Sequence, residues 1–198
     1  IMSQHNHTDE NPRNPGTELD LDWALAVQAN TSAIERRCKA LPGRRSIKKV
    51  NQAAWLLKAI TLMDLTTLAG DDTEERVRRL CAKARQPVRR DLLEAMGMPS
   101  DAIRVGAVCV YHQMVPAAVS ALAGSGIRVA AVSTGFPHGL SPIPQRIAEI
   151  KASVAAGARE IDIVVTRGHV LTGNWQALYD EVRSCREACG DAHIKTIL

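Results

Sequence analysis

A run of aliphatic residues with a carboxylate in its middle constrains this chain more than any other stretch. In residues 157–165, isoleucine and valine fill every position after Glu160 except Asp162, which is typical of a parallel strand buried on both faces. Because side chains alternate along a strand, Ile161 and Ile163 face the covering helices, and Asp162 faces the other side of the sheet or a barrel interior. An unpaired ionised carboxylate is costly there, so Asp162 is either a hydrogen-bonded structural residue or part of a wet, charged site.

Strand and helix patterns alternate through residues 51–198. Strands are expected in residues 60–65, 105–111, 127–133, 157–165 and 193–198. Helices are expected in residues 53–59, 72–84, 91–96, 115–122, 142–154 and 175–182. The second of these helices has Asp72 as its expected N-cap and Glu75 at the capping-box position. Strands that alternate with helices predict a parallel sheet built from right-handed crossovers.

Two architectures fit such a sheet, an open doubly wound sheet and a (β/α)8 barrel. The turn after the first strand has no Gly-rich phosphate loop, which argues against a nucleotide-binding open sheet. Polar residues instead lie within or at the ends of several strands: Asp64, Thr66, Cys109, Asp162 and Lys195. Because barrel active sites are assembled at the carboxyl ends of strands, we predict an incomplete (β/α)8 TIM barrel in residues 51–198, with about five βα units present.

Composition excludes several classes of protein. The chain has 198 residues, 45% of them hydrophobic, and a net charge of +4, which is typical of a globular domain and does not by itself imply nucleic-acid binding. Five cysteines without a secretory leader indicate free thiols in a reducing compartment. No apolar run approaches the roughly 20 residues of a membrane span, so we expect a soluble, cytoplasmic protein without a membrane partner.

The first 50 residues differ from the rest. Residues 1–16 are polar and rich in His, Asn and Pro, and we expect a disordered tail. Residues 17–50 are expected to form an N-terminal helical extension, with a helical pattern across residues 17–40. The extension carries a basic segment made of Arg36, Arg37, Lys39, Arg44, Arg45, Lys48 and Lys49. An RNA or an acidic protein partner is one hypothesis for this segment, but a solvated helix face is favoured because no aromatic residue is interleaved for base stacking.

Four segments, in order along the chain, resemble the deoxyribose-phosphate aldolase family. They are Leu62-Met63-Asp64-Leu65-Thr66-Thr67-Leu68 with Asp71-Asp72-Thr73, Val108-Cys109-Val110-Tyr111, Gly135-Phe136-Pro137-His138-Gly139, and Glu160-Ile161-Asp162-Ile163-Val164. Trp23 and residues 52–59 and 171–198 look like the animal form. The resemblance implies a class I aldolase, a lyase of deoxynucleoside catabolism that needs no metal or other cofactor. Such an enzyme reversibly cleaves a small phosphosugar, 2-deoxy-D-ribose 5-phosphate, to acetaldehyde and D-glyceraldehyde 3-phosphate through a Schiff base.

The resemblance also implies roles for individual residues. Asp162 matches the aspartate that moves protons in this family, and lysines that face it should pull its pKa down and keep it ionised. Asp64, Thr66 and Cys109 match residues that line the same substrate pocket. Animal members of the family imply a location in the cytoplasm, and also in the nucleus and cytoplasmic granules.

Lys195 imitates the Schiff-base lysine of the family, but two observations argue against that match. It follows Asp162 by one βα unit, whereas the family's lysine follows by two, and the Ser-Thr-Gly-Lys continuation of the motif is missing. We expect Lys195 to face the pocket as a supporting charge, and the Schiff-base lysine to lie outside this chain. Since Ile1 and Leu198 also look like cut ends, we predict a fragment that is inactive as it stands. The alternative is a non-catalytic truncated product that binds a partner through its basic segment; the sequence leaves the oligomeric state open.

Overall fold

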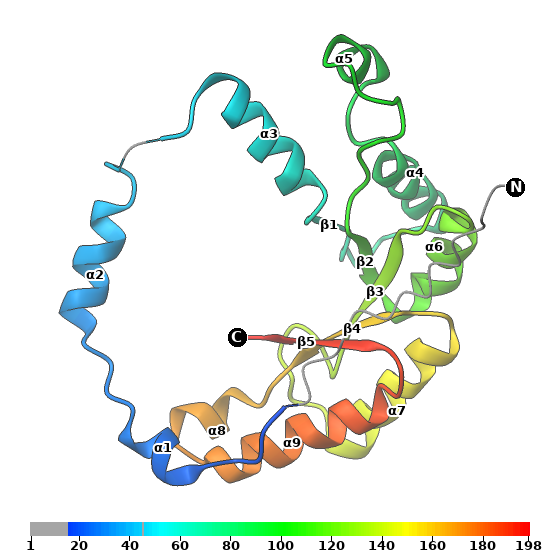
Figure 1. Cartoon of the computed structure of the whole chain (residues 1–198). Coiled ribbons are helices and arrows are strands. Elements are labelled where there is room, and N and C mark those ends of the chain that lie inside the picture. Colours follow the sequence, from blue (N-terminus) through cyan, green and yellow to red (C-terminus); the bar gives the residue numbers. More distant parts are fainter. Residues whose placement is uncertain (1–15, 45) are drawn as a thin grey trace, which may run out of the picture.

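The computed structural model describes residues 16–44 and 46–198 (Figure 1). The expected disordered tail, residues 1–16, lies outside the described residues except for Gly16. The elements follow in the order α1 (Leu21–Ala26), α2 (Thr31–Ala40), α3 (Lys49–Ile60), β1 (Asp64–Thr66), α4 (Glu74–Arg85), α5 (Arg90–Ala95), β2 (Ala107–Tyr111), the 3-10 helix η1 (His112–Met114), α6 (Val115–Leu122), β3 (Arg128–Ser133), α7 (Ile143–Ala155), β4 (Glu160–Val164), α8 (Arg167–Leu171), α9 (Trp175–Ala188) and β5 (His193–Ile197).

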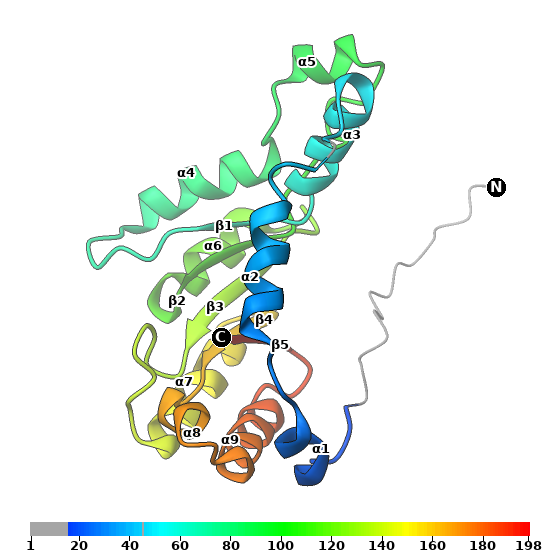
Figure 2. The same ribbon diagram turned by 90° about the vertical axis from the view of Figure 1, so that its left-hand side faces the viewer.

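The strands form one parallel, five-stranded sheet in the order β1-β2-β3-β4-β5. Four helices, α4, α6, α7 and α9, lie along the same face of this sheet (Figures 1 and 2). An open doubly wound sheet would reverse its strand order and carry helices on both faces. A strictly sequential order with the helices on one face is instead the arrangement of a barrel wall, as the sequence predicts.

The hydrophobic core lies between the strands and these helices. Val108 of β2 and Ile161 of β4 are 0% exposed, and Ile163 is 1% exposed. From α4, Val77 and Cys81 pack into the same cluster, together with Ala84. Burial of one such aliphatic side chain contributes about 1.5–3 kcal/mol to folding. The alternation that assigns Ile161 and Ile163 to the helix side of β4 is therefore confirmed.

The helical pattern in residues 17–40 is divided between two helices. α1 ends because Val27 adopts an extended conformation, with φ −68° and ψ 121°. α2 begins again after Asn30, whose side chain accepts a hydrogen bond from the Ala33 N–H. The expectation of one pattern across this stretch misses the interruption, because apolar spacing alone does not record a cap in its middle.

The N-cap of α4 is also one residue later than expected. Thr73 caps the helix, and its Oγ1 accepts a hydrogen bond from the Arg76 N–H at 3.3 Å. Asp72 instead accepts hydrogen bonds from the Thr67 hydroxyl and the Ala69 N–H. These bonds close the turn before the helix and lower the pKa of Asp72 against the opposing effect of burial. The prediction of Asp72 as N-cap was therefore wrong, because its carboxylate is engaged in the preceding turn.

The N-terminal helices contribute no buried residue to the hydrophobic core. No residue of α1, α2 or α3 is buried, and Trp23, Val50 and Trp55 are each more than 60% exposed. α1 contacts α9, whereas α2 stands away from the sheet (Figure 1). Among the described residues, no helix is both long and apolar enough to cross a lipid bilayer.

Truncation of a side chain is expected to distinguish the buried core from the exposed surface. The change Ile161→Ala removes a 0% exposed side chain from the contact between β4 and its helices, so it should lower the free energy of unfolding by about 2–5 kcal/mol. The matched control Leu171→Ala removes an 84% exposed side chain and should change it by less than about 0.5 kcal/mol. Urea denaturation followed by circular dichroism measures both, and equal effects would contradict this placement of the core.

Candidate active site

Charged side chains from β1, β4 and β5 meet on the face of the sheet that the four helices leave uncovered. The ammonium Nζ of Lys195 lies 2.5 Å from Oδ2 of Asp64, 3.0 Å from Oε2 of Glu160 and 3.2 Å from Oδ1 of Asp162. Cys109 of β2 joins the group, because its thiol donates to Oδ2 of Asp162 at 3.7 Å. We call these five residues the lysine cluster.

The contact between Lys195 and Asp64 requires a strongly curled sheet. These residues belong to β5 and β1, the two edge strands, which in a flat five-stranded sheet would lie about 19 Å apart at about 4.8 Å per strand. Two side chains and a hydrogen bond do not span that distance. The strands between them present Ala107 and Ala130 to the same interior, and these small side chains leave room for the lysine to cross. The cluster therefore lies inside the curve of a barrel wall.

Burial and three neighbouring carboxylates have opposite effects on the pKa of Lys195. Burial opposes the ammonium form, but Asp64, Glu160 and Asp162 outweigh burial and raise the pKa of Lys195 above its ordinary value. The Lys195 side chain is 33% exposed, so the site remains open to a ligand. Lys195 is therefore a fixed positive charge at neutral pH, as expected for a supporting lysine.

The pKa of Asp162 is raised, whereas the sequence predicts a lowered value. Burial is the largest influence and raises its pKa, and the negative charge of Asp64 raises it further. The charge of Lys195 and its hydrogen bonding lower the pKa but do not offset burial, because Lys195 is shared among three carboxylates. The expectation of a lowered pKa for Asp162 was wrong, although the lysine that was expected to face it is present.

Cys109 and Thr66 complete the set of expected pocket residues. Burial, followed by the charge of Asp162, raises the pKa of the Cys109 thiol to about 12, so this side chain is a neutral donor. Thr66 lies on the same face of β1 as Asp64, but it is exposed, and its hydroxyl donates to the Asp64 carbonyl at 3.2 Å. This bond reaches only the backbone of Asp64, and within the described residues no hydrogen bond joins Thr66 to a side chain of the lysine cluster. The structure therefore brings together the side chains of four of the five expected residues.

The loops after β3 and β4 border the site and are tied together by buried polar groups. Thr134 follows β3 with φ +62°, a conformation rare for a β-branched residue, and its Oγ1 accepts a hydrogen bond from the Val164 N–H at 2.6 Å. Arg146, 4% exposed, forms an ion pair of 2.9 Å with Glu181 and a hydrogen bond of 3.0 Å with the Thr166 hydroxyl. Glu181 also accepts from the Thr166 N–H at 2.9 Å. These contacts fix the Gly135–Gly139 loop beside the end of β4.

Sequence reasoning missed two parts of this arrangement. Glu160 lies on the same face of β4 as Asp162, so the two-residue period was a sufficient signal for it. Arg146 and Glu181 gave no comparable signal, because each lies on an amphipathic helix where charged residues usually face solvent. Within the described residues, no group of three or more His, Cys, Asp or Glu side chains is arranged to hold a metal ion.

An aldolase family matches most of the chain. The model of the DeoC/LacD aldolase family matches residues 58–198, which include all of the lysine cluster. The chain belongs to this family. It is 54% identical to the human deoxyribose-phosphate aldolase, over 100% of this chain and 60% of the human protein, and 56% identical to the mouse enzyme of that name, over 92% and 58%. The chain thus spans about 60% of the length of the curated relatives that it matches.

Solved structures of aldolases share the fold. A putative deoxyribose-phosphate aldolase from Coccidioides immitis aligns with a TM-score of 0.60 at 25% identity, over 78% of this chain and 52% of that one. An aldolase named QR15 aligns with a TM-score of 0.56 at 22% identity, over 70% of this chain and 54% of that one. The sequence-based prediction of a (β/α)8 barrel of which only part is present is confirmed.

The shared lysine predicts how the pKa of Asp162 responds to its neighbours. Removing a carboxylate with Asp64→Asn should lower the pKa of Asp162, and removing the cation with Lys195→Met should raise it. Carbon-detected NMR titration of the aspartate carboxyl groups measures the shift. Glu35→Gln, an exposed change on α2, is the control and should leave Asp162 unaffected. A rise in the Asp64→Asn variant would contradict the description of the cluster.

The raised pKa of Cys109 predicts selective alkylation. At pH 8 a thiol with a pKa of about 12 is almost entirely protonated, and Cys109 is also only 3% exposed. Iodoacetamide should therefore modify the exposed Cys38 and leave Cys109 intact in the folded chain, as measured by peptide mass spectrometry. Fast labelling of Cys109 before unfolding would show that the interior of the sheet is open to solvent at that position.

Proposed function

We propose that the chain supplies five βα units of a class I aldolase that cleaves 2-deoxy-D-ribose 5-phosphate to acetaldehyde and D-glyceraldehyde 3-phosphate. The family match and the names of the relatives support an aldolase of this kind. The observation that carries the proposal is the placement of Asp162 beside the protonated Lys195 on the inner wall of the sheet. A carboxylate next to a fixed cation, in a partly exposed interior, is suited to moving protons on a polar substrate.

The same geometry argues against Lys195 as the nucleophile. A lysine forms a Schiff base only through its unprotonated amine, and the usual ways to obtain that amine are burial in apolar surroundings or a neighbouring cation. Lys195 has the opposite environment, because three carboxylates stabilise its ammonium form. We therefore assign the Schiff-base lysine to the portion of the relatives that this chain does not span, and the 198-residue chain is inactive alone.

The chemistry assigned to Asp162 is the removal of one proton. When the Schiff base has formed at C1 of the sugar, Asp162 accepts the proton of the C3 hydroxyl. The C2–C3 bond then breaks, its electron pair moves toward the iminium, and glyceraldehyde 3-phosphate leaves with C3 as its aldehyde carbon. Because the pKa of Asp162 is raised toward neutral pH, its carboxylate is a stronger base for this step than that of an ordinary aspartate.

The other pocket residues receive supporting roles. Asp64 and Glu160 hold the Lys195 ammonium in place, so that its charge faces Asp162 throughout the reaction. Cys109 stays neutral and donates to Asp162, which fixes the orientation of the carboxylate. Thr66 presents an exposed hydroxyl at the carboxyl end of β1, where it is available to a hydroxyl group of the sugar.

A chimera tests the proposal directly. Residues 1–198 are joined to the C-terminal part of the human relative, and both this protein and the 198-residue chain are treated with acetaldehyde and borohydride. We expect trapping only in the chimera, on a lysine beyond Leu198, together with cleavage of 2-deoxy-D-ribose 5-phosphate. In the chimera, Asp162→Asn should lower kcat/KM by about 10²-fold or more, whereas Glu35→Gln should not change it. Stoichiometric trapping of the short chain at Lys195 would overturn the assignment of that residue.

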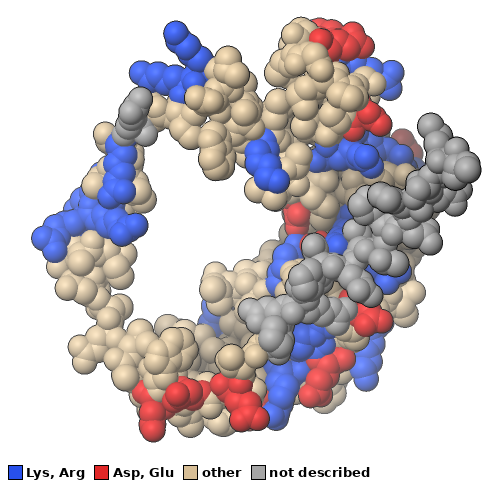
Figure 3. All heavy atoms as spheres, viewed as in Figure 1, with Lys and Arg blue, Asp and Glu red and all other residues tan. Residues whose placement is uncertain are grey.

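A second candidate function is a non-catalytic binding module. It is favoured by α2, which has no buried residue and exposes Arg36, Arg37 and Lys39 (Figure 3). An acidic partner would complement this surface. The same chimera decides between the two candidates, because a folded chimera without aldolase activity would leave the binding module as the better explanation.

A further inference from the structure

A cavity of about 730 Å³ lies at the opposite end of the sheet from the loops that border the lysine cluster. It is lined where strands begin: Arg128 is the first residue of β3, Arg159 directly precedes β4, and His193 is the first residue of β5. These residues come from three consecutive βα units, all of them within the described chain. None of the residues that line this cavity belongs to the lysine cluster, although Arg128 contacts Glu160 of that cluster.

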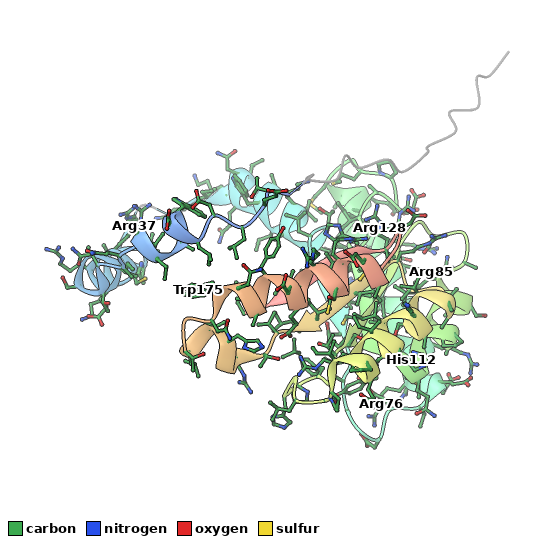
Figure 4. All side chains as sticks on the ribbon, turned by 90° about the horizontal axis from the view of Figure 1, so that it is seen from below. Arg37, Arg76, Arg85, His112, Arg128 and Trp175 are labelled. Carbon is green, nitrogen blue, oxygen red and sulfur yellow. The ribbon has the colours of Figure 1, made fainter. Side chains whose placement is uncertain are left out.

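Basic side chains gather around this end of the sheet, and several of them have a structural task. Arg85 donates to the carbonyls of Ala121 and Ala123, and Arg104 donates to that of Ser125. Figure 4 labels Arg85 and Arg128 on the same side of the molecule. Arg186 donates to the carbonyls of Gly190 and Ala192. These arginines satisfy carbonyl groups in the last turn of a helix or just beyond its end, which explains their presence without a ligand.

The basic residues that line the cavity have no comparable task. No hydrogen bond or ion pair of the Arg159 or His193 side chain occurs within the described residues, and both residues are exposed. Arg128 has only a long contact there, 3.5 Å from its Nη1 to Oε1 of Glu160. Asp191 also lines the cavity, so the lining carries two arginines and a histidine against one carboxylate. Such a surface favours an anion, and arginine is well suited to phosphate because its planar fork matches two oxygens.

The rest of the lining is formed by aliphatic residues and glycines. Val119, Leu122 and Ile127 form an aliphatic wall, while a Cβ atom at Gly124 would meet nothing within 4 Å. A Cβ atom at Gly157 would lie 3.1 Å from Val119, and the φ angle of +104° there also favours glycine. The cavity therefore combines an anion-binding edge with an apolar surface large enough for a small organic group.

We propose that this cavity binds a small phosphomonoester, with its phosphate on Arg159 and His193 and its organic group against the wall of Val119, Leu122 and Ile127. Arg128 lies at the edge of the same surface and adds a second guanidinium group. The assignment does not depend on the aldolase activity, because none of these residues belongs to the lysine cluster.

Isothermal titration calorimetry on the 198-residue chain tests the site with two probes, phenyl phosphate and inorganic phosphate. We expect both to bind, and phenyl phosphate to bind several-fold more tightly because its ring covers the apolar wall. Arg159→Gln and His193→Gln should each weaken binding by about tenfold or more, since each removes a charged or strong donor to the phosphate. The control Lys151→Gln, an exposed change on the outer side of α7, should leave binding unchanged.

Amide NMR spectra locate the bound probe independently of affinity. The Gly124, Gly126 and Gly157 resonances should shift on addition of phenyl phosphate, and those of residues 134–139 should not. Absence of binding up to about 10 mM, or binding that neither substitution at Arg159 nor at His193 weakens, would overturn the site. Equal affinity for the two probes would overturn the role of the apolar wall. Because all three variants change exposed side chains, circular dichroism should confirm that they keep the fold of the parent chain.

Discussion

The ammonium group of Lys195 is the interaction on which the rest of the inner face depends. It lies between three carboxylates that come from β1 and β4, and without it Asp64, Glu160 and Asp162 would place like charges together in a partly buried space. Removing one partner from such a group leaves the others uncompensated, which is far more costly than losing a pair on the surface. The same ammonium connects the two edge strands, so the charge balance of the site requires the curvature of the wall.

Much of this arrangement follows from periodicity in the sequence. The alternation around Asp162 predicts its direction, the βα spacing predicts Lys195 as its neighbour, and both are found. Periodicity does not predict whether burial or ion pairing has the larger effect on a pKa. The predicted direction of the Asp162 pKa shift was wrong for that reason. The balance depends on how many carboxylates share one cation, which requires knowing that Glu160 and Asp64 reach the same nitrogen.

Local turn chemistry was predicted less well than the strands. Asp72 and Thr73 are both good capping residues, and the choice between them depends on the turn at Thr67 and Ala69, which the helix pattern does not contain. The left-handed conformation of Thr134 is equally hidden, because a β-branched residue is an unlikely occupant of that region. Its hydroxyl takes the place of a backbone partner for Val164, the last residue of β4, in a tertiary contact between residues 30 positions apart.

Glu160 connects the lysine cluster to the cavity at the start of the strands. One of its oxygens lies 3.0 Å from the ammonium of Lys195, and the other lies 3.5 Å from the guanidinium of Arg128 at the start of β3. A ligand that pairs with Arg128 leaves Glu160 paired with Lys195 alone. It thereby changes how strongly Lys195 interacts with Asp162. Thermodynamic linkage makes this influence reciprocal: the free energy by which a ligand at the start of β3 changes the lysine cluster equals the free energy by which the cluster changes the binding of that ligand. One carboxylate that contacts two cations is thus enough to couple binding in the cavity to the charge balance of the lysine cluster.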